Sequence, residues 1–341
     1  MTDVLTSFFA DGTRVTAVPR RDDPRLVVAG AGVGERWRNS SLFPGHSRRG
    51  RLYRAAMRSL AATGLLQRRI GDQIEQPSWV RFLNGELPGA TAAAVLVGTA
   101  GPTQMITVEL RNPDGRIAGY GKYAELPKAI TRLLVEADTL RRLPPGIAPL
   151  VLRFGDWENG KLLLTTPVVG HKVSPTLPPA PAVDEYLDQL PRGGLYAIRE
   201  HPMIRRLVEH APGCAVWLGP LEGSWPTVVQ HGDFAPWNLR HVDHGIVAFD
   251  WEYATTEGFP GFDLAYYWMQ TQSLVQSRGP ERALEAAAGA VSSHLRESPA
   301  AGRVIAKLAM LDAFLIGRED GHPDDFPNQA WRLELLGDAF A

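Results

Sequence analysis

The sequence predicts an α+β protein with two lobes: a small lobe with an antiparallel β-sheet and one key helix, and a larger, mainly helical lobe. Three observations predict this division. Short apolar runs separated by turn residues indicate strands over residues 92–124. Apolar residues spaced by three and four indicate a helix over residues 130–143. A chain of 341 residues is also long enough for two hydrophobic cores, because single cores stop growing before roughly 250–300 residues.

The small lobe is predicted to hold a three-stranded meander, the helix and two further strands. Turn residues separate the strands of the meander, most clearly at residues 112–115, and Pro144-Pro145-Gly146 ends the helix. The predicted strands cover residues 92–96, 105–110, 117–123, 150–154 and 162–166.

The rest of the chain is less regular. Residues 167–181 are rich in proline and indicate a connector. Beyond them the chain is expected to be mainly helical, for example at residues 281–295 and 302–316, with one polar and aromatic interruption at 228–253. Residues 1–90 have Gly and Pro scattered among short apolar runs, and they predict no clear structure.

The composition is that of a globular enzyme. The chain is 44% hydrophobic and 21% charged with a formal net charge of −1, which argues against a disordered chain and against nucleic-acid binding driven by charge. No run of about 18 apolar residues and no signal peptide are recognised, so the cytoplasm is the expected compartment. The single cysteine, Cys214, excludes an internal disulfide and a cysteine metal cluster.

One polar segment carries the predicted chemistry. His231, Asp233 and Asn238 follow the spacing H-x-D-x-x-x-x-N, and Asp250 comes directly after an apolar strand at residues 246–249. Phosphoryl transfer to an alcohol needs a carboxylate that orients the hydroxyl and accepts its proton, and oxygen ligands that hold Mg²⁺ on the triphosphate. Asp233 suits the first task, and Asn238 and Asp250 suit the second.

The alternative interpretation of this segment is a polar turn between two strands, in which Asp233 and Asn238 make local hydrogen bonds. It does not explain the later aspartate behind an apolar strand, nor a second signal upstream. Lys122 lies late in the third predicted strand and Glu136 in the following helix. A kinase needs a cation on the α- and β-phosphates that is steered by a helix carboxylate. Taken alone, this pair would be interpreted as two surface residues; together with the loop it favours a nucleotide site.

Residues 231–238, with the sequence HGDFAPWN, together with Phe249-Asp250-Trp251-Glu252, resemble the signature of the aminoglycoside phosphotransferase and choline kinase superfamily. That superfamily shares the protein-kinase-like bilobal fold, and the resemblance covers about residues 92–320. It implies ATP as co-substrate, clamped between the lobes, and Mg²⁺ as cofactor. It also implies that Asp233 is the catalytic base and that Asn238 and Asp250 are the magnesium ligands.

The resemblance also implies adenine contacts to the backbone near Thr165 and Thr166. The loop at residues 98–104 lacks the G-x-G-x-x-G of protein kinases, although its amides can still cover phosphate. The cofactor-binding residues are therefore predicted to be Lys122, Glu136, Gly98, Thr99, Gly101, Thr165 and Thr166. Asp263 matches a family position that is structural, at the start of a helix. Glu252 is expected either to orient the catalytic loop or to contact substrate.

On this basis we expect three parts of the chain. Residues 1–90 form an N-terminal extension packed on the small lobe, residues 91–167 a small nucleotide-binding lobe that ends at the hinge, and residues 168–341 a large helical lobe with the catalytic loop and acceptor pocket.

Three further features of the sequence are weaker evidence for a function. The glycines at residues 30–34 lack the dinucleotide spacing, and no helix is expected after them. Residues 36–69 contain nine arginines and no acidic residue. Peripheral contact with an anionic surface is possible there, but we favour a packed helix with a solvated arginine side, in which Leu52, Ala56 and Leu60 form the apolar face. The histidine spacing does not indicate a zinc site.

The predicted function is an ATP-dependent small-molecule kinase. Its acceptor is the hydroxyl of an aminoglycoside, a sugar, an amino alcohol or a similar metabolite, with no nucleic-acid partner and no membrane span. The alternative is a catalytically silent kinase-like protein that binds nucleotide or scaffolds partners, and transfer of a different group is a third possibility. The sequence leaves open the acceptor, the choice between ATP and GTP, and the oligomeric state.

Overall fold

The structure is a computed structural model that describes residues 2–45, 48–70, 78–83 and 85–340. The chain divides into two compact units. The first unit is Met1–Ala137 with Pro149–Pro167, and the second is Asp138–Ala148 with Val168–Ala341. The sheet-based first unit and the mainly helical second unit confirm the predicted α+β fold class.

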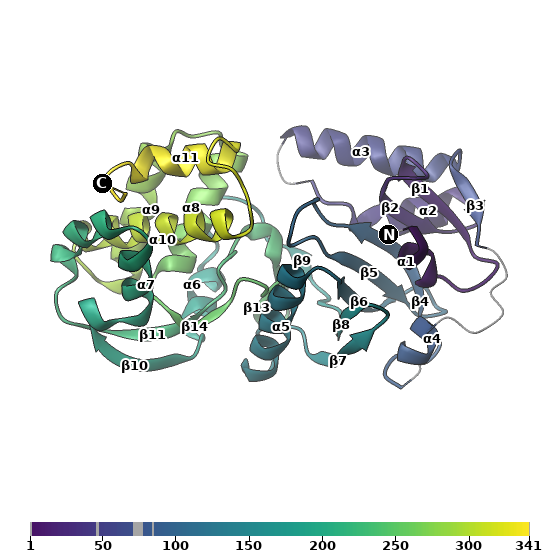
Figure 1. The fold of residues 1–341 in the computed structure, drawn as a ribbon, viewed down its shortest axis with the longest axis horizontal. Coiled ribbons are helices and arrows are strands. Elements are labelled where there is room, and N and C mark those ends of the chain that lie inside the picture. The colour runs from purple at the N-terminus through teal and green to yellow at the C-terminus, as the bar shows by residue number, and fades with distance from the viewer. Residues whose placement is uncertain (1, 46–47, 71–77, 84, 341) are drawn as a thin grey trace. The chain divides into compact units, whose positions relative to one another are not determined.

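An antiparallel sheet of eight strands lies at the centre of the first unit, in the order β3-β1-β2-β4-β5-β6-β8-β7 among the described residues (Figure 1). Strands β4 to β6 form the predicted meander, and β7 and β8 are the two later predicted strands. The strands are β1 (Arg14–Pro19), β2 (Pro24–Ala29), β3 (Gln67–Arg69), β4 (Thr91–Val97), β5 (Ile106–Arg111), β6 (Ile117–Ala124), β7 (Val151–Trp157) and β8 (Gly160–Thr165).

Residues 1–90 supply three strands of this sheet, because β2 pairs antiparallel with β4. Val27 lies opposite Val95, and both belong to a core rich in aromatic residues. The neighbouring pair of Val28 and Ala94 belongs to a second core. Since successive side chains of a strand point to opposite faces, both faces of the sheet are buried here. This explains why residues 26–29 read as a continuous apolar run without the alternation of a half-exposed strand.

The helices of the first unit are α1 (Thr2–Ser7), α2 (Val33–Asn39), α3 (Arg48–Thr63), α4 (Ser78–Leu83) and most of α5 (Pro127–Arg142). Helix α5 is the predicted helix, and it begins earlier than expected because Pro127 is suited to a first helical position. Helix α2 corrects the sequence interpretation, which expected no helix after the glycines at residues 30–34. The backbone N–H of Ala31 donates to the carboxylate of Glu35, so a side chain of the helix is the hydrogen-bond partner of this glycine-rich turn.

Helix α3 corrects a second prediction. Of the three residues expected on the apolar face, Leu52 is 74% exposed and Ala56 is exposed as well, whereas Leu60 is half-buried and packs on a core that includes Met57 and Ala61. The arginines of this helix also make contacts that the sequence did not predict. Arg54 donates to Ser41 O, and Arg58 donates to Trp37 O and Ser40 Oγ. The side of the helix that was expected to be solvated thus anchors α3 to the preceding segment.

The second unit is mainly helical, as predicted, and its helices are α6 (Pro181–Asp188), α7 (Pro202–His210), α8 (Phe262–Gln270), α9 (Pro280–Leu295), α10 (Pro299–Glu319) and α11 (Pro327–Leu336). Five of these six begin with proline, which lacks only an N–H that a first turn leaves unpaired. Helices α9 and α10 pack side by side (Figure 1). Leu284 and Ile305 from these helices belong to the main hydrophobic core of the unit.

Two small sheets in the second unit were not predicted as such. Their strand orders are β10-β11-β14 and β13-β12-β9. The strands are β9 (His171–Lys172), β10 (Arg192–Ala197), β11 (Ser224–Gln230), β12 (Leu239–Val242), β13 (Gly245–Ala248) and β14 (Thr255–Gly258). The predicted turn at residues 243–245 does form, because Val242 pairs with Gly245 and joins β12 to β13.

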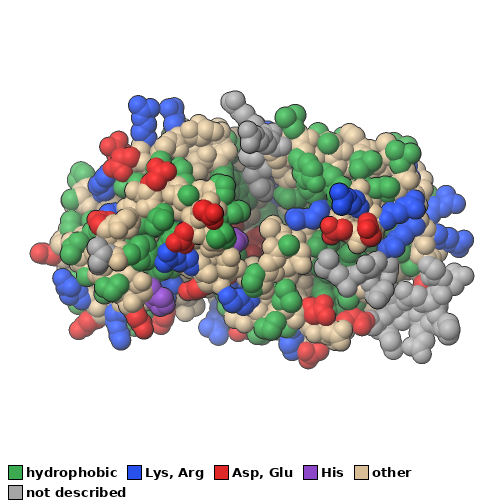
Figure 2. Space-filling model, turned by 45° about the horizontal axis from the view of Figure 1, so that its top comes forward, with side chains coloured by type: hydrophobic (Ala, Val, Ile, Leu, Met, Phe, Trp, Pro, Cys, Tyr) green, Lys and Arg blue, Asp and Glu red, His purple; other side chains and the backbone are tan. Residues whose placement is uncertain are grey.

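Charged and hydrophobic side chains are mixed over the visible surface (Figure 2). The formal charge is nevertheless unevenly divided along the chain. The second unit contains 23 Asp and Glu against 15 Lys and Arg, which is a formal charge of −8 in a chain whose total is −1. The first unit therefore carries the compensating positive charge. Among the described residues, no helix is both long and apolar enough to cross a membrane.

Candidate active site

Lys122 and Glu136 form an ion pair inside the first unit. Lys122 lies on β6 and Glu136 on α5, and Lys122 Nζ is 2.6 Å from Glu136 Oε2. The Glu136 side chain is only 4% exposed and that of Lys122 is 19% exposed. Ion pairs on the surface contribute little to the free energy of unfolding, but a partly buried pair fixes the position of the ammonium group. The sheet and the helix thus hold one cation at a defined place.

The loop between β4 and β5 is closed by its own backbone. Gly98 N donates to Met105 O at 2.8 Å, and a Cβ at Gly98 would lie 2.7 Å from the same oxygen. Gly98 therefore fits where a larger residue would collide, but its N–H is already paired. Of the three residues predicted to contact phosphate, Gly98 therefore cannot use its N–H, and the prediction is left with Thr99 and Gly101, of which Gly101 has a φ of 154°.

The predicted hinge lies at the end of β8. Thr165 pairs with Tyr120 of β6 and with Val151 of β7. Thr166 N donates to Leu150 O at 3.0 Å, and Thr166 Oγ1 accepts from Leu150 N at 2.9 Å. Because the N–H of Thr166 is paired, Thr166 could only accept a hydrogen bond from adenine, through its carbonyl oxygen.

In the second unit the HGDFAPWN segment connects β11 to the β12–β13 hairpin. His231 is fully buried, and its ring lies 4.5 Å from that of Trp251 between centroids. Its Nδ1 accepts from the backbone N–H of Asp233 at 3.3 Å, and its Nε2 lies 3.1 Å from Phe249 O. A nitrogen that accepts carries no proton, so this network assigns the proton to Nε2, which donates to Phe249. The histidine ties the loop to the end of β13.

Asp263, in the first turn of α8, holds the start of the same loop. Its carboxylate accepts from the backbone N–H of His231 at 2.7 Å and from that of Gly232 at 3.0 Å. Gly232 has a φ of 82°, and a Cβ there would lie 2.4 Å from Tyr253 O. A glycine is required at this position on both counts. The sequence analysis expected a structural role for Asp263 at the start of a helix. In the structure, Asp263 accepts two backbone hydrogen bonds from the loop.

The carboxylate of Asp233 is held by two donors. Asn238 Nδ2 donates to Asp233 Oδ2 at 2.8 Å, and the Tyr266 hydroxyl donates to Asp233 Oδ1, also at 2.8 Å. Burial and the nearby charge of Asp250 raise the pKa of Asp233 to about 6. The hydrogen bonds from Tyr266 and Asn238 and the charge of Arg332 act in the opposite direction.

Asn238 and Asp250 offer oxygen atoms from neighbouring positions. Asn238 Nδ2 also donates to the carbonyl of Asp233 at 2.9 Å, and the backbone N–H of Phe249 donates to Asn238 O at 3.0 Å. Because the amide nitrogen makes both side-chain bonds, the amide oxygen is the atom left to act as a ligand. Asp250 has a φ of 76°, which aspartate tolerates better than most residues.

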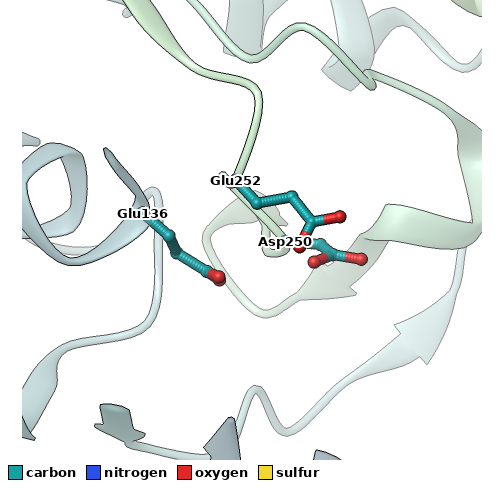
Figure 3. A group of neighbouring side chains, drawn as sticks. All are labelled: Glu136, Asp250 and Glu252. Carbon is teal, nitrogen blue, oxygen red and sulfur yellow. The ribbon is translucent and has the colours of Figure 1, made fainter. Parts of the chain in front are cut away.

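Figure 3 shows the Asp250 and Glu252 side chains on the segment after β13, and Glu136 on its own helix. An amide oxygen and a carboxylate are the kind of ligands that Mg²⁺ prefers, with water and phosphate supplying the others. The residues of this segment therefore fit the metal that the sequence implied.

Two residues of this site were missed in the sequence. Tyr266 lies three positions after Asp263 in α8, so both side chains leave the same face of the helix. That spacing was a usable signal once Asp263 was placed against the loop. Arg332 in α11 is 8% exposed and acts on both Asp233 and Tyr266. It lies roughly a hundred residues beyond the loop in the sequence, and no local pattern marks it.

The sheet unit holds a partly buried lysine–glutamate pair, and the helical unit holds an H-x-D-x-x-x-x-N loop with a following aspartate. These are the parts that the sequence analysis expects of a phosphotransferase. The chain belongs to the Phosphotransferase enzyme family (APH), whose model matches residues 31–303. This match includes Lys122 and the whole segment from His231 to Glu252, and it begins within the N-terminal ninety residues.

Solved structures similar to this chain have low sequence identity. Aminoglycoside phosphotransferase APH(3'')-Id from Streptomyces rimosus is 14% identical, covers 70% of this chain and 99% of its own, and gives a TM-score of 0.39. The same enzyme in complex with ADP and streptomycin is 16% identical, with coverages of 60% and 90% and a TM-score of 0.36. A candidate fructosamine-3-kinase from Haemophilus somnus is 12% identical, with coverages of 77% and 96% and a TM-score of 0.48. No curated protein matches the sequence.

Proposed function

We propose that this protein transfers the γ-phosphoryl group of ATP to a hydroxyl group of a small molecule, with Asp233 as the general base. One observation carries the proposal. Asn238 holds the Asp233 carboxylate through its amide nitrogen, which leaves its amide oxygen as a metal ligand, and Asp250 follows on the adjoining hairpin. A base and two hard oxygen ligands therefore come from one continuous segment.

The proposed reaction is an in-line displacement. The acceptor oxygen attacks the γ-phosphorus and forms a new P–O bond, while the bond from that phosphorus to the β-bridging oxygen breaks. ADP leaves with the electron pair, and the proton of the acceptor hydroxyl passes to the carboxylate of Asp233. The hydrogen bonds that His231 and Asp263 accept from backbone N–H groups hold the loop in place during the transfer.

Mg²⁺ held by Asn238 and Asp250 would supply positive charge against the triphosphate. On the first unit, the ammonium group of Lys122 would bind the α- and β-phosphates, with Glu136 fixing its position. Thr99 and Gly101 would contribute backbone groups to the phosphates, and the backbone at Thr165 and Thr166 would bind adenine.

The acceptor is proposed from charge and from family membership. A unit with a formal charge of −8 attracts cations over the distance of a Debye length. This favours an amino sugar, an aminoglycoside or an amino alcohol over a neutral sugar. Adding salt should then raise the KM for a cationic acceptor more than the KM for a neutral one.

The first experiment is a thermal-shift titration with ATP, GTP and ADP, with and without Mg²⁺. It is followed by a coupled ADP-release screen over aminoglycosides, neutral sugars and amino alcohols. Stabilisation that depends on Mg²⁺, together with ADP release for one acceptor class, would support the proposal. In the same assay Asp233→Asn should lose turnover and keep nucleotide-dependent stabilisation. Nucleotide binding without turnover by the wild-type protein for any acceptor would favour the silent kinase-like alternative.

A further inference from the structure

Tyr266 makes a contact with the candidate base that the proposed chemistry does not use. Its hydroxyl donates to Asp233 Oδ1 at 2.8 Å, while Asn238 donates to the other oxygen at the same distance. Each carboxylate oxygen therefore has its own side-chain donor. A planar carboxylate held at both ends cannot rotate freely about its last side-chain bond, so its orientation is fixed by Tyr266 as much as by Asn238.

The backbone that carries Tyr266 is itself coupled to the loop. Asp263 and Tyr266 are three residues apart in α8 and leave the same face of the helix. Asp263 accepts from the backbone N–H groups of His231 and Gly232. One helix face thus sets both the loop backbone and the carboxylate that the loop presents.

Arg332 acts on the same pair through its charge. Its Nη1 donates to Ala313 O at 3.0 Å and to Gln329 Oε1 at 2.8 Å, so the guanidinium is anchored between α10 and α11. Burial raises the pKa of both Asp233 and Tyr266, and the positive charge of Arg332 acts against that rise. A carboxylate without a proton can only accept hydrogen bonds, so the hydrogen of the Tyr266 hydroxyl is directed to Asp233.

We infer that Tyr266 is a positioning residue for Asp233 and holds the base carboxylate in the orientation that receives the acceptor proton. This inference rests on the proposed function. It assigns no chemistry to Tyr266 itself, because the hydroxyl acts through the carboxylate. The competing interpretation is that the tyrosine hydroxyl occupies the place of the acceptor hydroxyl, in which case it would compete with substrate.

The test is steady-state kinetics of Tyr266→Phe. We expect kcat to fall about 10- to 100-fold, because small misplacements of a reacting group have effects of this size, with the KM for ATP unchanged. Tyr267→Phe is the matched control. Tyr267 is the next residue, is fully buried, and has no hydrogen-bond partner for its hydroxyl among the described residues. It should keep the wild-type kcat.

Two further readouts separate a positioning role from general damage to the fold. Thermal unfolding of every variant is measured alongside, and the split between kcat and KM is a readout that a purely structural role would not produce.

The outcomes are distinct. ADP release is measured with the acceptor present, and the rate with water alone is subtracted as background. Unchanged kcat in Tyr266→Phe, or a lower acceptor KM with unchanged or higher kcat, would overturn the inference and leave the proposed function standing. Absence of Mg²⁺-dependent ADP release from the wild-type protein would overturn the proposed function, and this inference with it.

Discussion

The carboxylate of Asp263 accepts a hydrogen bond of 2.7 Å from the backbone N–H of His231. Its other oxygen takes the N–H of Gly232, so one buried side chain satisfies two successive backbone donors. Asp263→Ala leaves both donors without this acceptor. We expect the free energy of unfolding to fall by about 2–4 kcal/mol, since a buried unsatisfied group costs about 1–3 kcal/mol.

Chemical denaturation measures this loss, and kcat should fall with it because the loop loses its anchor. Asp263→Asn is the control, since its amide oxygen can still accept one of the two N–H groups. It should lose less stability than Asp263→Ala. Equal losses for the two variants would contradict the role of these hydrogen bonds.

The pH dependence of stability gives a second prediction for the same residue. Burial raises the pKa of Asp263 to about 7, the bonds from His231 and Gly232 oppose the rise, and the charges of Asp312 and Asp233 add to it. In the unfolded chain the pKa of an aspartate is about 3.9. The folded state therefore holds the proton more tightly, and its contribution to stability is complete below pH ~4 and is lost as the pH rises through ~7.

The measurement is the free energy of unfolding of the wild type minus that of Asp263→Asn, between pH 5 and 8. Since the amide does not titrate, this difference should decrease as the pH rises. Subtraction removes the opposite effect of Asp338, whose pKa is lowered by its contacts to Lys307 and Trp217 despite burial. A flat difference over this range would show that Asp263 keeps the same charge in the folded and unfolded states.

Much of the fold could be predicted because its signals are local. Strands β4 to β6 are separated by turn residues, α5 has helical spacing of apolar residues, and the β12–β13 hairpin has its turn in three adjacent positions. Strand β10 could not be predicted in this way. It contains Gly193 and Gly194, which are unfavourable in strands, and all its residues are exposed. It is a strand because it pairs with β11, which lies about thirty residues further along the chain.

The residues of the candidate site also differ in whether a local pattern could reveal them. Asp233, Asn238 and Asp250 lie within one short segment, so their spacing was visible in the sequence. Tyr266 contacts Asp233 from α8, and Arg332 acts on Asp233 through its charge from α11. Both effects depend on the packing of α8, α10 and α11, which no local pattern shows. Residues 1–90 had no assignable role for a similar reason. Their strand β2 finds its partner, β4, across some seventy residues.

The left-handed backbone at Gly232 gives a third prediction. Gly232→Ala places a Cβ 2.4 Å from Tyr253 O at a φ of 82°. We expect a loss of about 1–3 kcal/mol in the free energy of unfolding and a large fall in kcat, because Asp233 is the next residue. The matched control is Gly289→Ala in α9, where a Cβ meets nothing within 4 Å. It should gain about 0.5–1 kcal/mol, since alanine is favoured in a helix interior. If Gly232→Ala were as stable as Gly289→Ala, the strain argument would be wrong.

Two substitutions of Asp250 separate the effect of its carboxylate from the effect of its backbone conformation. Asp250→Asn keeps a residue that tolerates a positive φ, whereas Asp250→Ala does not. Both should lose the Mg²⁺-dependent part of the thermal shift with ATP and at least about 100-fold in kcat. Asp250→Ala alone should also lose about 1 kcal/mol of stability without nucleotide, from the left-handed backbone. Retention of full Mg²⁺-dependent stabilisation by Asp250→Asn would exclude the residue as a metal ligand.

Lys122→Met tests the phosphate-binding role of the ion pair in the first unit. The thioether chain fills a similar volume without charge, so we expect the KM for ATP to rise and kcat/KM for ATP to fall about 100-fold or more. Lys161→Met is the control, because Lys161 pairs with Asp156, whose side chain is 83% exposed, on the β7–β8 hairpin. That exposed pair is worth about 1 kcal/mol or less, and its loss should leave kcat/KM unchanged. Glu136→Gln should resemble Lys122→Met in a weaker form, since the ammonium group stays but loses its charged partner. Equal kinetics for Lys122→Met and Lys161→Met would remove Lys122 from the nucleotide site.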